Sequence, residues 1–186
     1  YKFVSYMRRI VNCYSKVRGG NHMELVDVLN ERKEKNGKVC DRNGLCEGEF
    51  RLSVHIWIIN NNNEILLQKR NRNLKVYPGM WGNTGGAAKM GESSLEAIKR
   101  EVKEELGLTI KSEKMIFIAS FKRSKDFVDV WLLKDDIKVD DIKLQENEVE
   151  AVKFINRSTF NKLYENGQII QSSTEYFKMY MDKYMN

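Results

Sequence analysis

Residues 93–107 carry the start and stop signals of one helix, and that helix restricts what the chain can fold into. Ser93 and Glu96 stand three positions apart ahead of an apolar-periodic stretch, which is the pattern of a capping box. Gly107 follows, and glycine is the residue that most often ends a helix in the left-handed conformation. The pattern therefore predicts a helix over Ser94–Leu106.

This helix has an apolar stripe beside an acidic one. The apolar stripe, which we expect to face the core, consists of Leu95, Ile98, Val102 and Leu106. The acidic stripe holds Glu101, Glu104 and Glu105, at i, i+3 and i+4. Like charges at this spacing oppose each other by about a few tenths of a kcal/mol per pair. A solvated helix face would tolerate that repulsion, but a hard cation such as Mg²⁺, which prefers carboxylate, water and phosphate oxygens, would remove it.

The residues that flank the acidic stripe favour the metal interpretation. Gly85 and Gly86 permit close approach of the backbone and can offer a carbonyl ligand. Arg100 can bond to a carboxylate of the cluster and hold it in position. Seven fixed residues and two aliphatic positions at these spacings arise by chance in roughly one chain of this length in ten million.

The spacing resembles the Nudix box, G-x5-E-x7-R-E-U-x-E-E-x-G-U, at every specified position from Gly86 to Leu108. A wider similarity extends from about Met23 to Phe154 and includes the strings at 65–70 and 78–81. The resemblance implies an α/β fold, an α/β/α sandwich with a mixed β-sheet. It also implies hydrolysis of a nucleoside diphosphate linked to another group, so that the partner is a small-molecule nucleotide or related diphosphate.

The resemblance also implies a role for each residue of the box. Mg²⁺, with Mn²⁺ as a substitute, would be bound by Glu101, Glu104, Glu105 and the carbonyl of Gly86, while Glu92 and Arg100 would support the box. For the general base we favour Glu104 or Glu105. Glu148, in the loop before the last strand, is the second choice, and a solvated loop acid is the alternative interpretation of that residue.

Substrate-binding residues are expected around the loop 71–79. Tyr77 and Trp81 flank Pro78-Gly79 just before the box, so they are well placed to stack on a ligand. Arg70 belongs to a basic run that precedes them and can contact phosphate. Arg51 begins a strand and either binds a substrate phosphate or lies at the surface. Trp57 stands among isoleucines in mid-strand and is expected in the core.

Two rival functions stay open. The stretch from Met23 to Trp81 is similar to the branch of the superfamily that includes isopentenyl-diphosphate isomerases, which need a thiol. Glycines stand at Gly85 and Gly86, where those enzymes have cysteines, so isomerase activity is disfavoured. The second rival is a non-catalytic nucleotide-binding module. Such proteins usually lose box residues, and this chain has lost none.

The remaining helices and strands are predicted from hydrophobic periodicity and from the turn residues between them. Expected strands are Glu24–Leu29 and Lys38–Asp41 as a hairpin, Arg51–Ile59, Glu64–Gln68, Met115–Phe121, Val128–Leu133 and Val149–Ile155. Helices are expected at Ser158–Asn166 and Ser173–Tyr184. The second of these places five large side chains on one face, which favours core packing over a dimer contact; a homodimer remains an expectation from the resemblance.

Charge and composition exclude several function classes. The net charge is +6, but residues 1–22 contain five basic residues and no acid, so the Nudix-like domain at 23–186 carries only +1. We therefore expect no nucleic-acid partner. No apolar run reaches the roughly 20 residues that cross a bilayer, and the three cysteines form no C-x-x-C pair. A cytoplasmic protein without a membrane partner is expected. Residues 1–22 are interpreted either as a genuine basic extension or as sequence upstream of a natural start at Met23.

Overall fold

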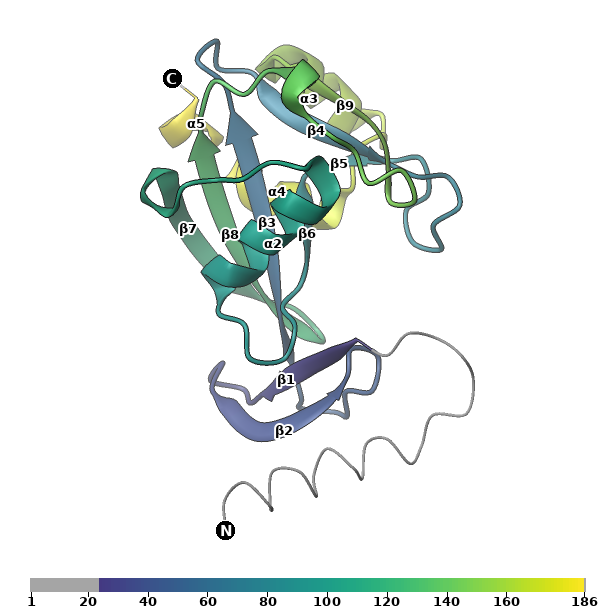
Figure 1. Ribbon diagram of the computed structural model, residues 1–186, viewed down its shortest axis with the longest axis vertical. Coiled ribbons are helices and arrows are strands. Elements are labelled where there is room, and N and C mark those ends of the chain that lie inside the picture. The colour runs from purple at the N-terminus through teal and green to yellow at the C-terminus, as the bar shows by residue number, and fades with distance from the viewer. Residues whose placement is uncertain (1–23, 186) are drawn as a thin grey trace.

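The computed structural model describes residues 24–185 (Figure 1). The two interpretations of the basic segment 1–22 therefore lie outside the described residues. The strands are β1 (Leu25–Leu29), β2 (Lys35–Asp41), β3 (Arg51–Ile59), β4 (Ile65–Arg70), β5 (Trp81–Gly82), β6 (Thr84–Ala87), β7 (Met115–Lys122), β8 (Asp126–Lys134) and β9 (Val149–Ile155). The helices are α2 (Ser94–Leu106), α3 (Arg157–Glu165), α4 (Gln171–Lys178) and α5 (Met181–Tyr184), with short 3₁₀ turns at Ser112–Lys114 and Val139–Asp141. No described helix has the length and apolar character needed to cross a membrane.

The main sheet is mixed, as expected. Its strands follow the order β5-β4-β3-β8-β7, with β6 beside β3 and β9 beside β4. β3 and β8 run parallel over Arg51–Ile59, whereas β6 pairs with β3 in the antiparallel sense at Ser53–Ile56. β1 and β2 form a separate antiparallel hairpin. The central strand β3 therefore has β8 on one side, and its first half has β6 on the other.

Helices cover both faces of this sheet, which confirms the α/β/α sandwich (Figure 1). Alternate side chains of β3 point to opposite faces because the period of a strand is two residues. Ile56 and Ile58 pack with the apolar stripe of α2, whereas Trp57 and Ile59 pack with residues of the C-terminal helices. Burial on both faces explains why the β3 sequence is almost continuously apolar.

The predicted helix appears as α2 with the expected boundaries. The Ser93 hydroxyl accepts from the Glu96 backbone N–H, and the Glu96 carboxylate accepts in return from the Ser93 backbone N–H. Gly107 ends the helix with φ of 70°. Ile98 and Val102 are fully buried, and each such side chain contributes about 1.5–3 kcal/mol on removal from water. Packing and capping together therefore hold the acidic stripe at a defined angle to the sheet.

Some boundaries differ from the sequence prediction. β2 begins at Lys35 rather than Lys38, and β4 spans Ile65–Arg70 rather than Glu64–Gln68. β6 was not predicted, because its two glycines have low intrinsic strand propensity and only pairing with β3 makes it a strand. The predicted helix at Ser173–Tyr184 is divided into α4 and α5, since Tyr180 N–H bonds to Phe177 at 2.8 Å in a tight turn.

The aromatic face of the C-terminal helices packs on the core. Phe177 is fully buried and stacks on Trp57 with ring centroids 4.3 Å apart. Tyr176 stacks on Phe121 at 4.1 Å. The predictions of core packing for this face and of a core position for Trp57 are therefore confirmed.

Candidate active site

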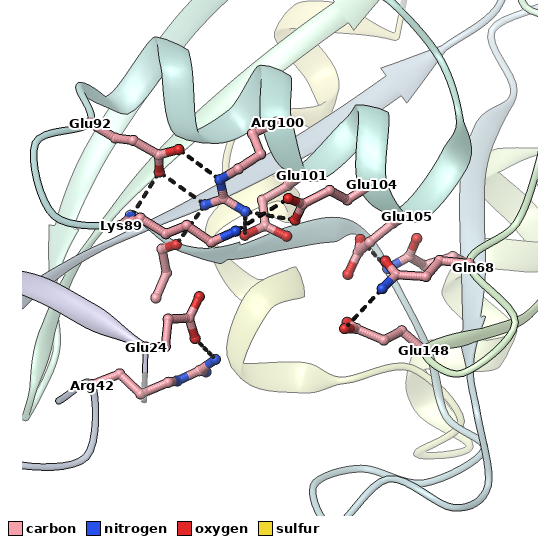
Figure 2. A network of polar contacts seen from close by, with 12 residues as sticks. Glu24, Arg42, Gln68, Lys89, Glu92, Arg100, Glu101, Glu104, Glu105 and Glu148 are labelled. Carbon is pink, nitrogen blue, oxygen red and sulfur yellow. Dashed lines mark hydrogen bonds and ion pairs between the residues drawn. The ribbon is translucent and has the colours of Figure 1, made fainter. Parts of the chain in front are cut away.

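Arg100, in the middle of α2, joins Glu92 of the preceding loop to Glu101 and Glu104 of the helix (Figure 2). Its Nε donates to Glu92 Oε1 at 2.7 Å and its Nη2 to Glu92 Oε2 at 3.0 Å. Its Nη1 donates to Glu101 Oε1 at 2.8 Å and to Glu104 Oε2 at 2.9 Å. Nη2 also donates to the Ala87 carbonyl at 3.0 Å. One planar guanidinium thus ties the loop before the helix, two turns of α2 and strand β6 into one unit.

Burial and charge act against each other in this unit. Burial lowers the pKa of Arg100, but its hydrogen bonds and charge interactions with the three glutamates outweigh that effect and raise the pKa overall. Burial alone would raise the pKa of Glu92, and the bonds from Arg100 and the Lys89 backbone reverse this, so its pKa is lowered. Glu101 differs, because burial, together with the charges of Glu104 and Glu24, raises its pKa more than Arg100 lowers it. Arg100 alone therefore does not compensate for the burial of the Glu101 carboxylate, and a further positive charge would stabilise its ionised form.

Gly86 lies directly against the Glu101 carboxylate. Glu101 is only 8% exposed. A Cβ built on Gly86 would stand 2.3 Å from Glu101 Oε1, a separation that real contacts do not reach. The missing side chain at this position is therefore what lets the Glu101 carboxylate approach the backbone of β6. The expected close approach at Gly85-Gly86 is present.

Glu105 lies in a different environment from its two neighbours. It is 3% exposed, and Gln68 Nε2 donates to its Oε2 at 2.8 Å. Burial is the main cause that raises the pKa of Glu105 to about 8; the bonds from Gln68 and the Gly85 backbone N–H oppose the rise, and the charges of Glu101 and Glu148 add to it. Glu105 therefore has hydrogen-bond donors but no cationic partner within the described residues.

The three glutamates of the acidic stripe do not meet at one point. Glu101 and Glu104 share Arg100, Glu104 also pairs with Lys89 at 3.2 Å, and Glu105 turns toward Gln68. Within residues 24–185 no three His, Cys, Asp or Glu side chains are grouped as metal ligands. The donors nonetheless fit a hard divalent cation, because two buried carboxylates with raised pKa values lie on one helix beside the Gly86 backbone.

Glu148 reaches this site from the other side. The loop that carries it is attached to the end of α2, where Gln145 N–H donates to the Glu105 carbonyl at 3.2 Å and Lys143 N–H to the Leu106 carbonyl at 2.9 Å. Glu148 N–H in turn donates to the Gln145 carbonyl at 2.8 Å. Figure 2 shows the Glu148 and Glu105 carboxylates on facing sides, and the charge of Glu148 raises the pKa of Glu105. The structure thus brings Glu148 to the predicted site.

The hairpin contributes charged residues that sequence reasoning did not identify. Arg42 Nη1 donates to Glu24 Oε2 at 2.6 Å, and both lie below Arg100 in Figure 2. Arg51 donates through Nη1 to the Arg42 carbonyl at 2.6 Å, forms no ion pair with a described residue, and has a buried Nε without a hydrogen-bond partner there. Glu24 acts electrostatically on both Glu101 and Arg51. No local motif marks Glu24 or Arg42, because only the docking of the hairpin brings them near α2. Arg51, at the start of β3, was already a candidate from the sequence.

The other expected substrate residues make their contacts outside the network of glutamates. Arg70 Nε donates to the Val76 carbonyl at 3.0 Å and so holds the loop 71–79. Tyr77 is 44% exposed, with φ of 50°. Trp81 is half-buried, and Lys153 Nζ lies 4.1 Å from its ring centroid. Within residues 24–185 no hydrogen bond or ion pair links these three side chains to the glutamates of α2.

Comparison with known proteins agrees with this geometry. The sequence profile of the NUDIX domain matches residues 49–175. The chain belongs to the Nudix family. An uncharacterized Nudix hydrolase of Listeria innocua is 36% identical over 150 residues, which cover 80% of this chain and 89% of that protein. Nudix hydrolases act on pyrophosphate bonds, and this chain is an enzyme of that class.

Two further proteins are similar to this Nudix chain. A nucleoside triphosphatase, NudI, of an Enterobacter species is 38% identical over 82 residues, which cover 44% of this chain and 49% of that protein. The crystal structure of DR0079 from Deinococcus radiodurans has a TM-score of 0.71 at 21% identity and covers 84% of this chain and 99% of that one. The latter similarity shows the Nudix fold.

The two glycines at 85–86 bear on the isomerase alternative. A Cβ on Gly85 would lie 2.2 Å from the Val54 carbonyl oxygen and 2.8 Å from His55 Cδ2. A cysteine at position 85 would therefore require a shift of the backbone, and a cysteine at position 86 would require the Glu101 carboxylate to move. Among the described cysteines, Cys40 is buried and Cys46 is exposed, and both belong to the hairpin region.

Proposed function

We propose that this Nudix hydrolase uses Mg²⁺, with Mn²⁺ as a substitute, to cleave the diphosphate bond of a nucleoside diphosphate linked to another moiety. One observation carries the proposal. The buried Glu101 and Glu105 carboxylates lie one helical turn apart on α2, and burial raises the pKa of both. A divalent cation supplies the positive charge that such a pair needs to stay ionised.

The proposed ligands are the carboxylates of Glu101, Glu104 and Glu105 and the carbonyl of Gly86. When bound there, the metal neutralises phosphate charge and lowers the pKa of a coordinated water. Glu92 and Arg100 support the ligands, because Arg100 bonds to Glu92, Glu101 and Glu104 at once. Glu104 is 42% exposed in its side chain and can turn from Lys89 toward a ligand without opening the core.

The general base is assigned to Glu104 or Glu105, and Glu148 is the second candidate. A base has to lie within hydrogen-bond reach of the attacking water, directly or through one water molecule. Glu104 faces solvent, whereas Glu105 and Glu148 face each other across the site. The bonds of Arg100 go to Glu92, Glu101, Glu104 and the Ala87 carbonyl, so the Glu148 carboxylate can receive a proton without disturbing the Arg100 network.

The remaining substrate contacts are proposed for Arg51, Arg70, Tyr77 and Trp81. Among the described residues neither arginine forms an ion pair with a carboxylate, although the charges of Asp126 and Glu24 act on Arg51. Both guanidinium groups can therefore still bind a phosphate. Tyr77 is exposed enough to stack on a base. The similarity to NudI, whose name describes a nucleoside triphosphatase, places nucleoside triphosphates in the first panel beside ADP-ribose and sugar nucleotides.

The test is hydrolysis of this panel with Mg²⁺ or Mn²⁺, with identification of the products. Wild type should release a nucleoside monophosphate or pyrophosphate from at least one compound. We expect Glu104→Gln to lower kcat by about 10²-fold or more, because it removes a carboxylate that binds metal or accepts a proton. Stability should change by less than about 0.5 kcal/mol, since the side chain is largely exposed.

Glu165→Gln, an exposed change on α3, is the matched control and should keep full activity. The proposal fails if wild type cleaves nothing in the panel, or if it takes up neither metal in the presence of nucleotide.

A further inference from the structure

Gln68, Thr84 and Glu105 form a buried chain of hydrogen bonds that links three separate elements. Thr84 Oγ1, on β6, donates to Gln68 Oε1, on β4, at 3.0 Å. Gln68 Nε2 then donates to Glu105 Oε2, on α2, at 2.8 Å. The three residues are 5%, 3% and 3% exposed. Figure 2 shows the Gln68 side chain directed at Glu105, on the side of α2 away from Arg100.

The chemistry of the three groups sets the direction of these bonds. The ionised Glu105 carboxylate, which is the form that binds a divalent cation, only accepts. In that form the amide nitrogen of Gln68 must face Glu105 and its oxygen must face Thr84. A hydroxyl can donate to that oxygen, and a valine at position 84 could not. The carboxylate therefore selects the flip state of the Gln68 amide, and the Thr84 hydroxyl adds a second bond that holds the side chain in that state. The selected state presents an N–H group to the carboxylate.

Glu105 needs such a donor because the Arg100 network does not reach it. Arg100 bonds to Glu92, Glu101 and Glu104, whereas the donors to Glu105 are Gln68 and the Gly85 backbone. A glutamate side chain has several rotatable bonds, and a misplacement of about 1 Å at a reacting centre can reduce the rate about 10²-fold. Two donors from different elements restrict the carboxylate to one orientation.

We propose that Gln68, oriented by Thr84, is a positioning residue that fixes the Glu105 carboxylate for the divalent cation. This inference rests on the proposed function of Glu105 as a metal ligand. Gln68 does for Glu105 what Arg100 does for Glu101 and Glu104, but without adding positive charge. Partners that orient a metal ligand in this way typically contribute about 10–100-fold to metal affinity or activity.

A purely structural role for Gln68 predicts a different result. Buried polar groups need partners in any protein, so loss of Gln68 would lower stability without a specific effect on metal binding. Measurement of Mn²⁺ affinity in the absence of nucleotide separates the two roles. Electron paramagnetic resonance of free Mn²⁺ reports this affinity directly and does not depend on turnover.

The experiment measures Mn²⁺ affinity for the wild-type chain, for Gln68→Met, for Thr84→Val and for the double variant. Thermal melting and kcat at saturating metal are measured for the same four proteins. Gln68→Met keeps the length of the side chain and removes the donor. We expect it to weaken Mn²⁺ binding by about 10–100-fold and to lower kcat with little change in KM. Thr84→Val should have a smaller effect in the same direction. That effect should vanish in the Gln68→Met background, because Thr84 acts through Gln68.

Thr174→Val is the matched control. Thr174 is also fully buried, and its hydroxyl donates to the Ile170 carbonyl at 2.7 Å. This change should lower the melting temperature and leave Mn²⁺ affinity and kcat unchanged. If Gln68→Met fails to fold, the nearly isosteric Thr84→Val carries the test.

Mn²⁺ affinity within twofold of wild type for both Gln68→Met and Thr84→Val would overturn the inference. If wild type binds Mn²⁺ but hydrolyses nothing in the panel, the proposed function fails alone, and the affinity ratios still decide the role of Gln68. If wild type takes up no Mn²⁺ with or without nucleotide, both the proposed function and this inference are wrong.

Discussion

The Glu101 carboxylate occupies the space between α2 and β6 that a side chain at position 86 would need. The 2.3 Å separation between a Cβ at Gly86 and Glu101 Oε1 means that an added methyl group must displace the carboxylate. We expect Gly86→Ala to lower activity by about 10²-fold through this displacement and stability by about 1–3 kcal/mol through overpacking. Enzyme assay and urea unfolding would measure both effects. Gly44→Ala, whose Cβ would stand 3.3 Å from the nearest atom, is the control and should keep full activity.

His55 makes the fold sensitive to acid. Burial is the main cause that lowers its pKa from 6.5 to about 4, and Nδ1 has no partner within the described residues. Between these two pH values the unfolded chain binds a proton that the folded chain excludes, so stability is full above pH 6.5 and falls as the pH drops toward 4. The expected loss is about 2–3 kcal/mol.

Urea unfolding of wild type and His55→Gln at several pH values would test this. The variant should lack the His55 contribution, so the stability difference between the two proteins should shrink or reverse in acid. A difference that does not vary with pH would contradict the assignment.

The capping box is the element-scale feature that sets where α2 begins. The Ser93 hydroxyl satisfies a backbone N–H that would otherwise lack a partner in the first turn. We expect Ser93→Ala to lower the free energy of unfolding by about 1 kcal/mol, seen as a lower urea midpoint with an unchanged m-value. Ser112→Ala, at an exposed serine that accepts from Lys99 but caps no helix, should stay within about 0.5 kcal/mol of wild type. Equal effects of the two changes would refute the capping assignment.

At the scale of the whole molecule, the hairpin is attached to the sheet by a charged contact. Lys33, in the turn between β1 and β2, pairs with Asp129 of β8 and also donates to Ser120 of β7 at 2.9 Å. The Asp129 side chain is only 5% exposed. Lys33→Met would leave a buried carboxylate without its cation, and the expected cost is about 2–3 kcal/mol after allowance for the partial exposure of the lysine.

Lys114→Met is the control for this contact, because its partner Asp135 is 34% exposed. Its cost should stay below about 1 kcal/mol. Limited proteolysis offers a second measurement, since a loosened hairpin in the Lys33→Met variant should be cleaved faster between residues 30 and 48. Equal losses of stability in the two variants would show that the buried pair Lys33–Asp129 stabilises the fold no more than the exposed pair Lys114–Asp135.

Short-range sequence patterns predicted the bounds of α2 and of β3. Helix geometry places i, i+3 and i+4 side chains on one surface whatever surrounds them. The acidic stripe, and a bond from Arg100 to a carboxylate of it, therefore followed from spacing. Ser93 and Gly107 bounded the helix correctly for the same reason, because capping depends on residues three or four apart. β3 was predicted from its nearly continuous apolar run, which burial on both faces requires.

Tertiary structure decided the surroundings of those elements. Gln68 meets Glu105 across 37 positions of sequence, and this contact depends on where β4 lies relative to α2. Strand β6 exists because β3 offers it hydrogen bonds. The sequence by itself determined the helix and its acidic stripe, since both depend on residues three or four positions apart. It also determined the family, because the motif at 86–108 is read from the order of residues alone. Only packing decided that the Arg100 guanidinium bonds to Glu101 and Glu104 while the Gln68 amide bonds to Glu105. The contact between Gln68 and Glu105 joins groups that no local spacing relates.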